Sequence, residues 1–153
     1  MRAIEPWVEG PLSAFLSESS ARVTLLMTAS GQVVAQHGFT RSLDVMAAAA
    51  LGAGIVASTT ELARIMGTPP LGTVAHQGSA MGIFLSPFDT PRGRWIALVV
   101  FGPESSIGIV QLFFNRLVAD VAQAAPPAPA PRQVLAENFE AELQQSLRSL
   151  FGR

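Results

Sequence analysis

The sequence predicts an α+β fold, with one five-stranded antiparallel sheet, a long helix on one face and two helices on the other. Its segments run in the order helix, hairpin, long helix, three-stranded meander and helix, which is typical of layered α+β domains. The 153 residues are 49% hydrophobic, enough for one core. A proline-rich stretch, residues 125–131, follows the last of these segments. We therefore expect a domain over residues 1–124, a linker over 125–132 and an amphipathic helix over 133–153.

The first elements are a short helix and a hairpin. Pro11 suits the first turn of a helix over residues 11–20, where Leu12 and Phe15 fall on one side. Two strands, residues 22–28 and 32–37, flank a turn of small residues and therefore predict a hairpin.

The long helix is expected over residues 42–67. Ser42 is the candidate N-cap, Asp44 suits the positive end of the helix dipole, and Gly67 before Thr68-Pro69-Pro70 ends the helix. No charged residue occurs between Val45 and Thr60. A helix without a solvated face must be covered all round, and a domain of this size usually covers one side.

Small residues on this helix indicate what covers the other side. Gly52 and Gly54 each cost roughly 1 kcal/mol relative to alanine, which close packing of a second backbone would offset. The hypotheses are a helix shared between two subunits and, alternatively, the central core helix of one domain. A membrane span is not expected, because the run is weakly apolar and is followed by Glu61 and Arg64.

The meander follows Pro70. Strands are predicted over residues 71–76, 81–85 and 94–101, with a loop over 87–93. The last strand is the most apolar and should be central, whereas the strand over 71–76 should lie at an edge, open to a second copy. A helix capped by Ser105 or Ser106 should extend to Ala124. Its expected inner residues are Ile109, Leu112, Phe113, Leu117 and Val121.

The tail combines a stiff spacer with an amphipathic helix. The spacer, APPAPAP, spans roughly 20 Å if extended. The helix after it carries an apolar stripe of Leu135, Phe139, Leu143, Leu147 and Leu150. A lone helix of this length is marginal in water, so it needs a groove. A partner's surface, its own domain and fraying in solvent remain alternatives.

Catalytic groups are scarce. The chain has no cysteine, lysine or tyrosine, and His37 and His76 are its only histidines. It lacks the glycine-rich phosphate-binding motifs, and a net charge of −1 gives no footprint for nucleic acid. The candidate arginine fingers for a GTPase are Arg41, Arg64, Arg92 and Arg94, and none stands out. We therefore expect no catalytic residue, cofactor or metal, and a cytoplasmic protein, since the first ten residues lack a signal-peptide pattern.

Three segments in order resemble the Roadblock family: Leu62–Gly67 closing the long helix, His76-Gln77-Gly78 with Met81-Gly82 in the meander, and Ser106–Leu112 opening the last domain helix. Within the family, the chain is most similar to bacterial regulators of a small Ras-like GTPase of the MglA type. The resemblance covers residues 21–124. It implies a homodimer with paired long helices and a sheet continued across the dimer, which activates the GTPase without an arginine finger and serves polarity or motility at cell poles.

The resemblance also implies site residues. The expected GTPase contacts are Ala53, Gly54, Ala57, Glu61, Arg64, Leu143, Leu147, Leu150 and Phe151. The expected dimer contacts are Ala47, Ala50, Gly54, Ser58, Leu71, Thr73 and Ala75. Ile55 stands where the family tends to have asparagine, and Gln111, Phe114 and Asn115 stand where it tends to have basic residues. The alternatives are a non-catalytic scaffold of the same fold and, more remotely, an enzyme or ligand sensor.

Overall fold

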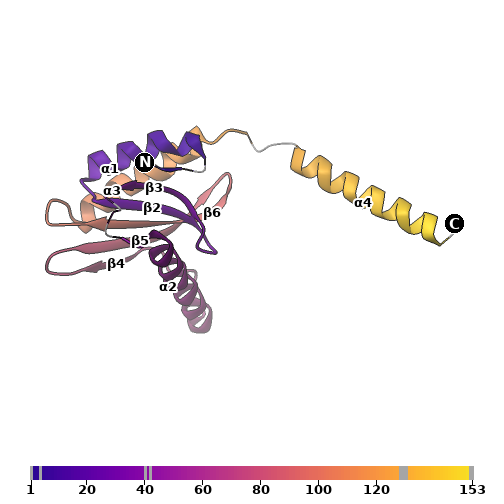
Figure 1. Ribbon diagram of the computed structural model, residues 1–153. Coiled ribbons are helices and arrows are strands. Elements are labelled where there is room, and N and C mark those ends of the chain that lie inside the picture. Colours follow the sequence, from indigo (N-terminus) through magenta and orange to yellow (C-terminus); the bar gives the residue numbers. More distant parts are fainter. Residues whose placement is uncertain (1, 4, 40, 42, 128–130, 152–153) are drawn as a thin grey trace.

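The structure, a computed structural model, describes residues 2–151 except 4, 40, 42 and 128–130. Its core is an antiparallel sheet with helices on both faces (Figure 1). The elements in chain order are β1 (Arg2–Ala3), the short 3₁₀ helix η1 (Pro6–Val8), α1 (Glu9–Ser19), β2 (Val23–Thr28), β3 (Val33–Gly38), α2 (Val45–Met66), β4 (Val74–Gln77), β5 (Gly82–Thr90), β6 (Gly93–Phe101), α3 (Ile107–Ala124) and α4 (Pro131–Leu150).

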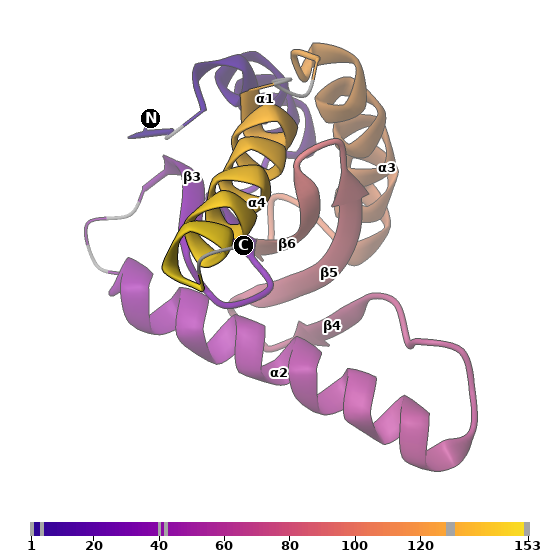
Figure 2. The same ribbon diagram turned by 90° about the vertical axis from the view of Figure 1, so that its right-hand side faces the viewer.

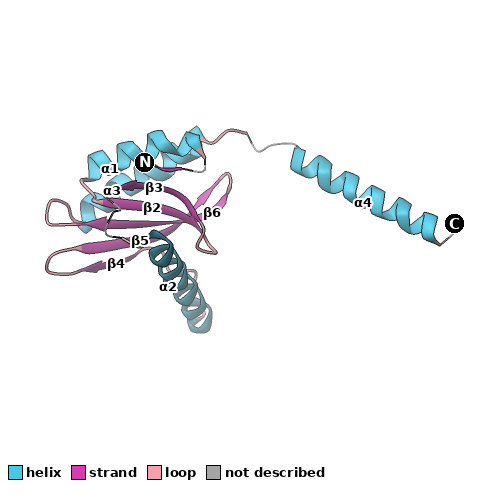
Figure 3. Ribbon diagram, viewed as in Figure 1, coloured by secondary structure: helices cyan, strands magenta, loops and turns pink. Residues whose placement is uncertain are grey.

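The predicted fold class is confirmed. The strand order is β1-β3-β2-β6-β5-β4, which makes β6 central and β4 an edge strand as expected. Helices α1 and α3 cover one face, α2 lies on the other, and α4 stands apart from the domain (Figure 3). The sheet also contains β1, a two-residue strand that pairs with Ala35 and Gln36 and is too short to produce a sequence pattern.

The expected loop over residues 87–93 is wrong, because β5 continues to Thr90 and pairs with β6 throughout. Pro87 lies inside this strand, opposite Ile96. Strand β4 stops pairing with β5 at Leu85, so β5 has a free edge at Pro87, where the missing N–H group costs no ladder bond.

The face covered by α1 and α3 is filled by large aromatic side chains. The ring centroid of Phe114 lies 5.2 Å from that of Phe84 and 5.6 Å from that of Phe88, and Trp95 stacks on Trp7 at 5.8 Å. These contacts fix the rotation of α3. Its buried residues are Val110, Phe114, Leu117 and Val121. Expected inner residues Ile109 and Leu112 are instead 41% and 64% exposed, since the sheet takes the neighbouring apolar stripe that carries Phe114.

Candidate functional site

Helix α2 begins and ends with well-formed caps. Asp44 is the N-cap, and its Oδ1 accepts a bond from the Ala47 N–H at 3.0 Å, whereas the expected cap Ser42 lies outside the described residues. Gly67 ends the helix in the left-handed conformation, with φ at 68°, as the sequence predicted. The N–H groups of Gly67 and Thr68 bond to the carbonyls of Arg64 and Ala63. Both ends of α2 are therefore fixed by caps, which defines the helix as residues 45–66.

The packed side of α2 consists of small residues. Ala49, Gly52 and Ala53 lie on a layer of aliphatic side chains from the sheet. A Cβ atom at Gly52 would lie 3.4 Å from Leu85 Cδ1, so glycine permits the close approach there. Ala53, expected at the GTPase contact, is 7% exposed and belongs to this internal layer, which corrects that assignment.

The opposite side of α2 is uncovered. Predicted contact residues Ala47, Ala50, Gly54, Ala57 and Ser58 are all exposed, and a Cβ atom at Gly54 would meet nothing within 4 Å. Large apolar side chains that were not among the predicted contacts share this exposed surface: Met46, Leu51, Ile55, Leu62, Ile65 and Met66. In the sequence, the feature that could have indicated this exposed apolar surface is the absence of charged residues between Val45 and Thr60. We call this exposed surface of residues 46–66 the α2 platform.

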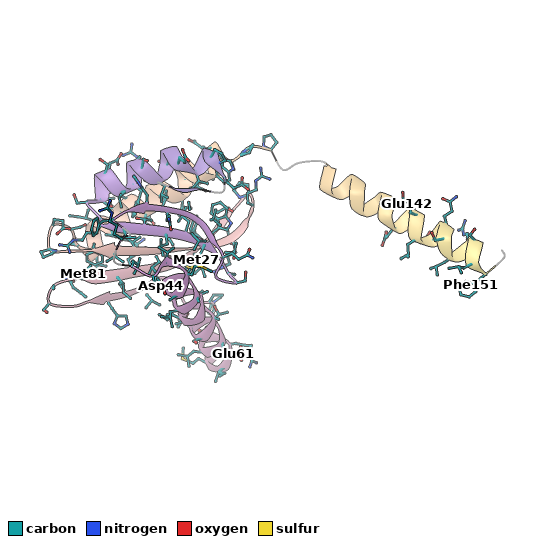
Figure 4. The ribbon with its side chains drawn as sticks, in the orientation of Figure 1. Met27, Asp44, Glu61, Met81, Glu142 and Phe151 are labelled. Atoms are coloured by element: carbon teal, nitrogen blue, oxygen red, sulfur yellow. The ribbon has the colours of Figure 1, made fainter. Side chains whose placement is uncertain are left out.

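The second half of α2 extends past the sheet. Figure 2 shows it projecting beyond edge strand β4, and Figure 4 places Glu61 on the part of the helix that points away from the sheet. Ala63 is the one residue of this half that is buried. Among the described helices, α2 alone is long and apolar enough to cross a membrane, on length and composition.

Three successive hydroxyl groups of α2 are satisfied by its own backbone. Ser58 Oγ donates to the Gly54 carbonyl at 2.8 Å, and the Thr59 and Thr60 hydroxyls donate to the Val56 carbonyl at 2.9 and 2.8 Å. A hydroxyl that already has a partner loses little when water is removed. This part of the helix can therefore be covered by another protein at low desolvation cost.

The charged residues of the platform pair with each other. Arg64 Nε donates to Glu61 Oε1 at 2.9 Å, and this hydrogen bond raises the pKa of Arg64. Both side chains are exposed, so the pair contributes little to folding stability. Two opposite charges therefore remain at the exposed surface of α2.

The edge strand carries the rest of the predicted dimer contact. Strand β4 pairs with β5 alone among the described strands, so its other edge is open, and it contains Ala75. Leu71 and Thr73 precede β4, because residues 68–73 bring the chain back from the projecting end of α2, and the strand assignment for these two is wrong. Thr73 instead donates from Oγ1 to Ser86 Oγ at 3.1 Å.

Residues that could support catalysis are not gathered anywhere in the described part of the chain. It holds no group of three or more histidine, cysteine, aspartate or glutamate side chains that could bind a metal. A hollow of about 260 Å³ near the β4–β5 turn is lined by no ionisable side chain; its lining is Gln77, Gly78, Ser79, Ala80, Met81, Gly82, Phe101, Gly102, Pro103 and Ser105. His37 is partly buried, and burial lowers its pKa. His76 lies exposed on β4.

The tail helix α4 begins at Pro131, two residues before the expected start, because proline is well suited to a first helical position. Leu143, Leu147, Leu150 and Phe151 are all exposed, so the described part of the tail's apolar stripe is uncovered. The side chains of Leu135 and Phe139, which also belong to this stripe, lie outside the described part. Residues 152 and 153, at the end of the predicted helix, also lie outside it.

Comparison with known proteins identifies the fold. MglB from Myxococcus xanthus superposes with a TM-score of 0.69 at 22% identity, covering 76% of this chain and 92% of that one. The gliding protein MglB from Thermus thermophilus gives 0.69 at 26% identity, over 82% and 93%. A Roadblock/LC7 domain from Streptomyces avermitilis gives 0.60 at 19% identity, over 71% and 89%. No family model and no curated protein matches. The chain therefore has the Roadblock fold in the form found in MglB.

Proposed function

We propose that the protein is a homodimeric regulator of a small Ras-like GTPase of the MglA type, with no catalytic site of its own. The observation that carries this proposal is the α2 platform, an uncovered apolar helix face beside an open sheet edge. The fold it shares with MglB supports the same conclusion, because it belongs to regulators and adaptors.

The dimer uses the small residues of the platform and the edge of β4. Ala47, Ala50, Gly54 and Ser58 follow one another at spacings of three and four, so they form one stripe along α2. A second α2 can approach such a stripe closely. At the same time β4 can pair with its own copy and continue the sheet, which removes the open edge.

The GTPase then binds the platform that remains beside the paired helices. Leu51, Ile55 and Leu62 form a ridge on one side of the small stripe, and Glu61 and Arg64 lie on the other side of that stripe. An apolar centre with a charged border is the usual anatomy of a protein interface. The tail helix adds a second contact through Leu143, Leu147, Leu150 and Phe151 and promotes nucleotide exchange.

Activation works by reshaping the partner's catalytic groups and without an arginine finger. Two of the candidate fingers are already engaged, Arg64 by Glu61 and Arg94 by Asp89, whose Oδ1 lies 3.6 Å away. An arginine finger increases the rate of GTP hydrolysis by a factor of about 10³ to 10⁵. The proposed dimer therefore supplies binding energy that orders the GTPase.

The second candidate is a scaffold that binds a GTPase without activating it. Ile55, Gln111 and Asn115 differ from the family pattern at positions outside the buried core, and these changes favour this alternative. The difference at Phe114 carries no such weight, because that side chain is buried against Phe84 and Phe88.

Hydrolysis assays separate the two candidates. A cognate MglA-type GTPase is mixed with a stoichiometric amount of dimer, and GTP turnover is compared for wild type, Arg64→Ala and Arg94→Ala. The proposal expects acceleration by wild type and a loss below about tenfold in either variant, since neither arginine is a finger. Binding without acceleration supports the scaffold, a loss of about 10³ identifies a finger, and absence of binding refutes both candidates.

A further inference from the structure

We propose that α4 has a seat on its own domain and folds back along α3 as an antiparallel helical hairpin. In this folded-back state Leu143 packs on Leu112. The structure shows α4 extended away from the domain (Figure 4). The described leucines of its apolar stripe, and Ile109 and Leu112 on α3, are exposed. Leu143, Leu147 and Leu150 are also proposed GTPase contacts, so the folded-back state describes the protein without a GTPase bound.

The first argument is that the two helices leave matching apolar residues exposed. Ile109 and Leu112 are the exposed large apolar residues of the α1/α3 layer among the described side chains. On α4, Leu143, Leu147 and Leu150 lie on one face because they are four and three residues apart. Each apolar surface is exposed to water when α4 is extended, and each would cover the other in the hairpin.

The second argument is the register that the chain itself imposes. Leu112 lies 12 residues before Ala124, where α3 ends, and Leu143 lies 12 residues after Pro131, where α4 begins. At 1.5 Å per residue both side chains are about 18 Å from the connection. An antiparallel hairpin therefore places them opposite each other without any slip between the helices.

The same register agrees at neighbouring positions. Leu147 falls opposite Gly108, which has no side chain to block a leucine, and a Cβ atom added to this glycine would have no contact closer than 4.0 Å. Glu140 falls opposite Asn115 and beside Arg116, an exposed cation whose Nη1 lies 3.1 Å from Glu18 Oε2. The folded-back state thus brings a carboxylate to a basic residue and a leucine to a glycine.

The connection permits the hairpin. Six residues, 125–130, join the helices, which is within the range of two to eight for helix–helix connections. Proline restricts the backbone of the residue before it to extended conformations, and Pro127 and Pro129 are each followed by alanine. The ψ angle of Pro127 is therefore not restricted in this way and allows the chain to turn after it, whereas Ala125, which precedes a proline, is extended with φ −63° and ψ 126°.

Disulfide trapping tests the register directly, because the chain has no cysteine of its own. The pair Leu112→Cys with Leu143→Cys is oxidised mildly in the full chain, at low protein concentration. The matched control keeps Leu112→Cys and pairs it with Gln145→Cys, which lies on the other side of α4. We expect intramolecular crosslinking of the first pair to be about tenfold faster, since a disulfide requires Cα atoms closer than about 7 Å.

Two further arms make the result decisive. Leu51→Cys with Leu143→Cys reports docking of the tail on α2, and a mixture of the two single-cysteine variants Leu112→Cys and Leu143→Cys reports docking on another copy. Equal rates for the test and control pairs, faster trapping on α2, or crosslinking in the mixture at the rate of the double variant would each overturn the proposal.

Hydrogen exchange gives an independent readout that needs no cysteine. A docked α4 should protect the amides of residues 140–151, whereas an undocked helix of this length is marginal in water and exchanges fast. Leu112→Glu should remove the protection, and Gln32→Glu, which also adds one negative charge but at an exposed turn of the domain, should keep it. Exchange that is equally fast in wild type and Leu112→Glu contradicts the folded-back state.

Discussion

The two faces of the sheet solve the packing problem in different ways. On the α1/α3 face, phenylalanine and tryptophan rings fill the space between two helices and the strands, and the core is closed. On the α2 face, alanines and glycine bring one helix close to the sheet, and the far side of that helix remains uncovered. One face is closed within the subunit, and the other keeps apolar side chains exposed to solvent.

The difference shows that small residues on one helix can have two separate roles. Gly52 faces the sheet and allows close packing within the subunit, whereas Gly54, two residues later, faces solvent and has open space around it. Sequence composition treats these glycines alike. Their rotation about the helix axis decides which one packs on the sheet and which one faces solvent.

The largest expected effect contrasts a residue of the closed face with one of the platform. Phe84→Ala should lower the free energy of unfolding by about 3–5 kcal/mol, because it opens a cavity under Phe114. Leu51→Ala should change the stability of the isolated subunit by less than about 0.5 kcal/mol, since the side chain is exposed. Denaturant unfolding at low protein concentration checks both, and equal losses would contradict the division between faces.

A pair of glycine substitutions sharpens the comparison within α2. Gly52→Leu should destabilise the subunit by about 1–3 kcal/mol, because the new side chain overlaps Leu85 and Met27. Gly54→Leu should leave the subunit folded and, with glycine's helix penalty removed, stabilise α2 by about 1 kcal/mol. It should nevertheless dissociate the proposed dimer. Size-exclusion chromatography combined with thermal unfolding distinguishes the two, and a Gly54→Leu protein that remains dimeric would remove the small stripe from the interface.

The smallest expected effect concerns His37 on β3. Burial lowers its pKa from the usual value of about 6.5, so the folded state favours the neutral imidazole. The resulting stability is present above pH 6.5 and is lost as the pH falls through the lowered pKa of the folded state. His37→Gln should therefore lose less stability than wild type between pH 7 and pH 5, measured by denaturant unfolding at fixed concentration. An unchanged pH dependence would assign the effect to other groups.

The sequence predicted the order of the elements because most of them carry local signals. Gly67, Ser106 and the turn at residues 29–31 mark ends that the structure confirms, since Ser106 Oγ accepts the Ile109 N–H at 3.2 Å. The failures are non-local. Nothing near Pro87 in the sequence shows that β4 has already stopped pairing, and only the contact with the sheet selects the Phe114 stripe of α3 over the Leu112 stripe.

The kind of candidate site could be predicted from the sequence, but its residues were predicted incompletely. The charge-free run of α2 indicated an uncovered helix, and the structure shows one. Periodicity alone left open which small residues faced the sheet, so Ala53 was placed on the wrong side. The large residues Leu51, Ile55 and Leu62 were not predicted as contacts, because apolar side chains are ordinary in a core helix and informative only once they are found exposed.

The hydroxyl groups that bond to the backbone of α2 also affect the shape of this helix. Hydroxyl groups that bond to carbonyls one turn back tend to bend a helix, and Ser58, Thr59 and Thr60 follow Val56, the last α2 residue packed on the aliphatic layer. We therefore expect any change in the curvature of α2 on binding to lie at residues 56–60, between the packed first half of the helix and the buried Ala63.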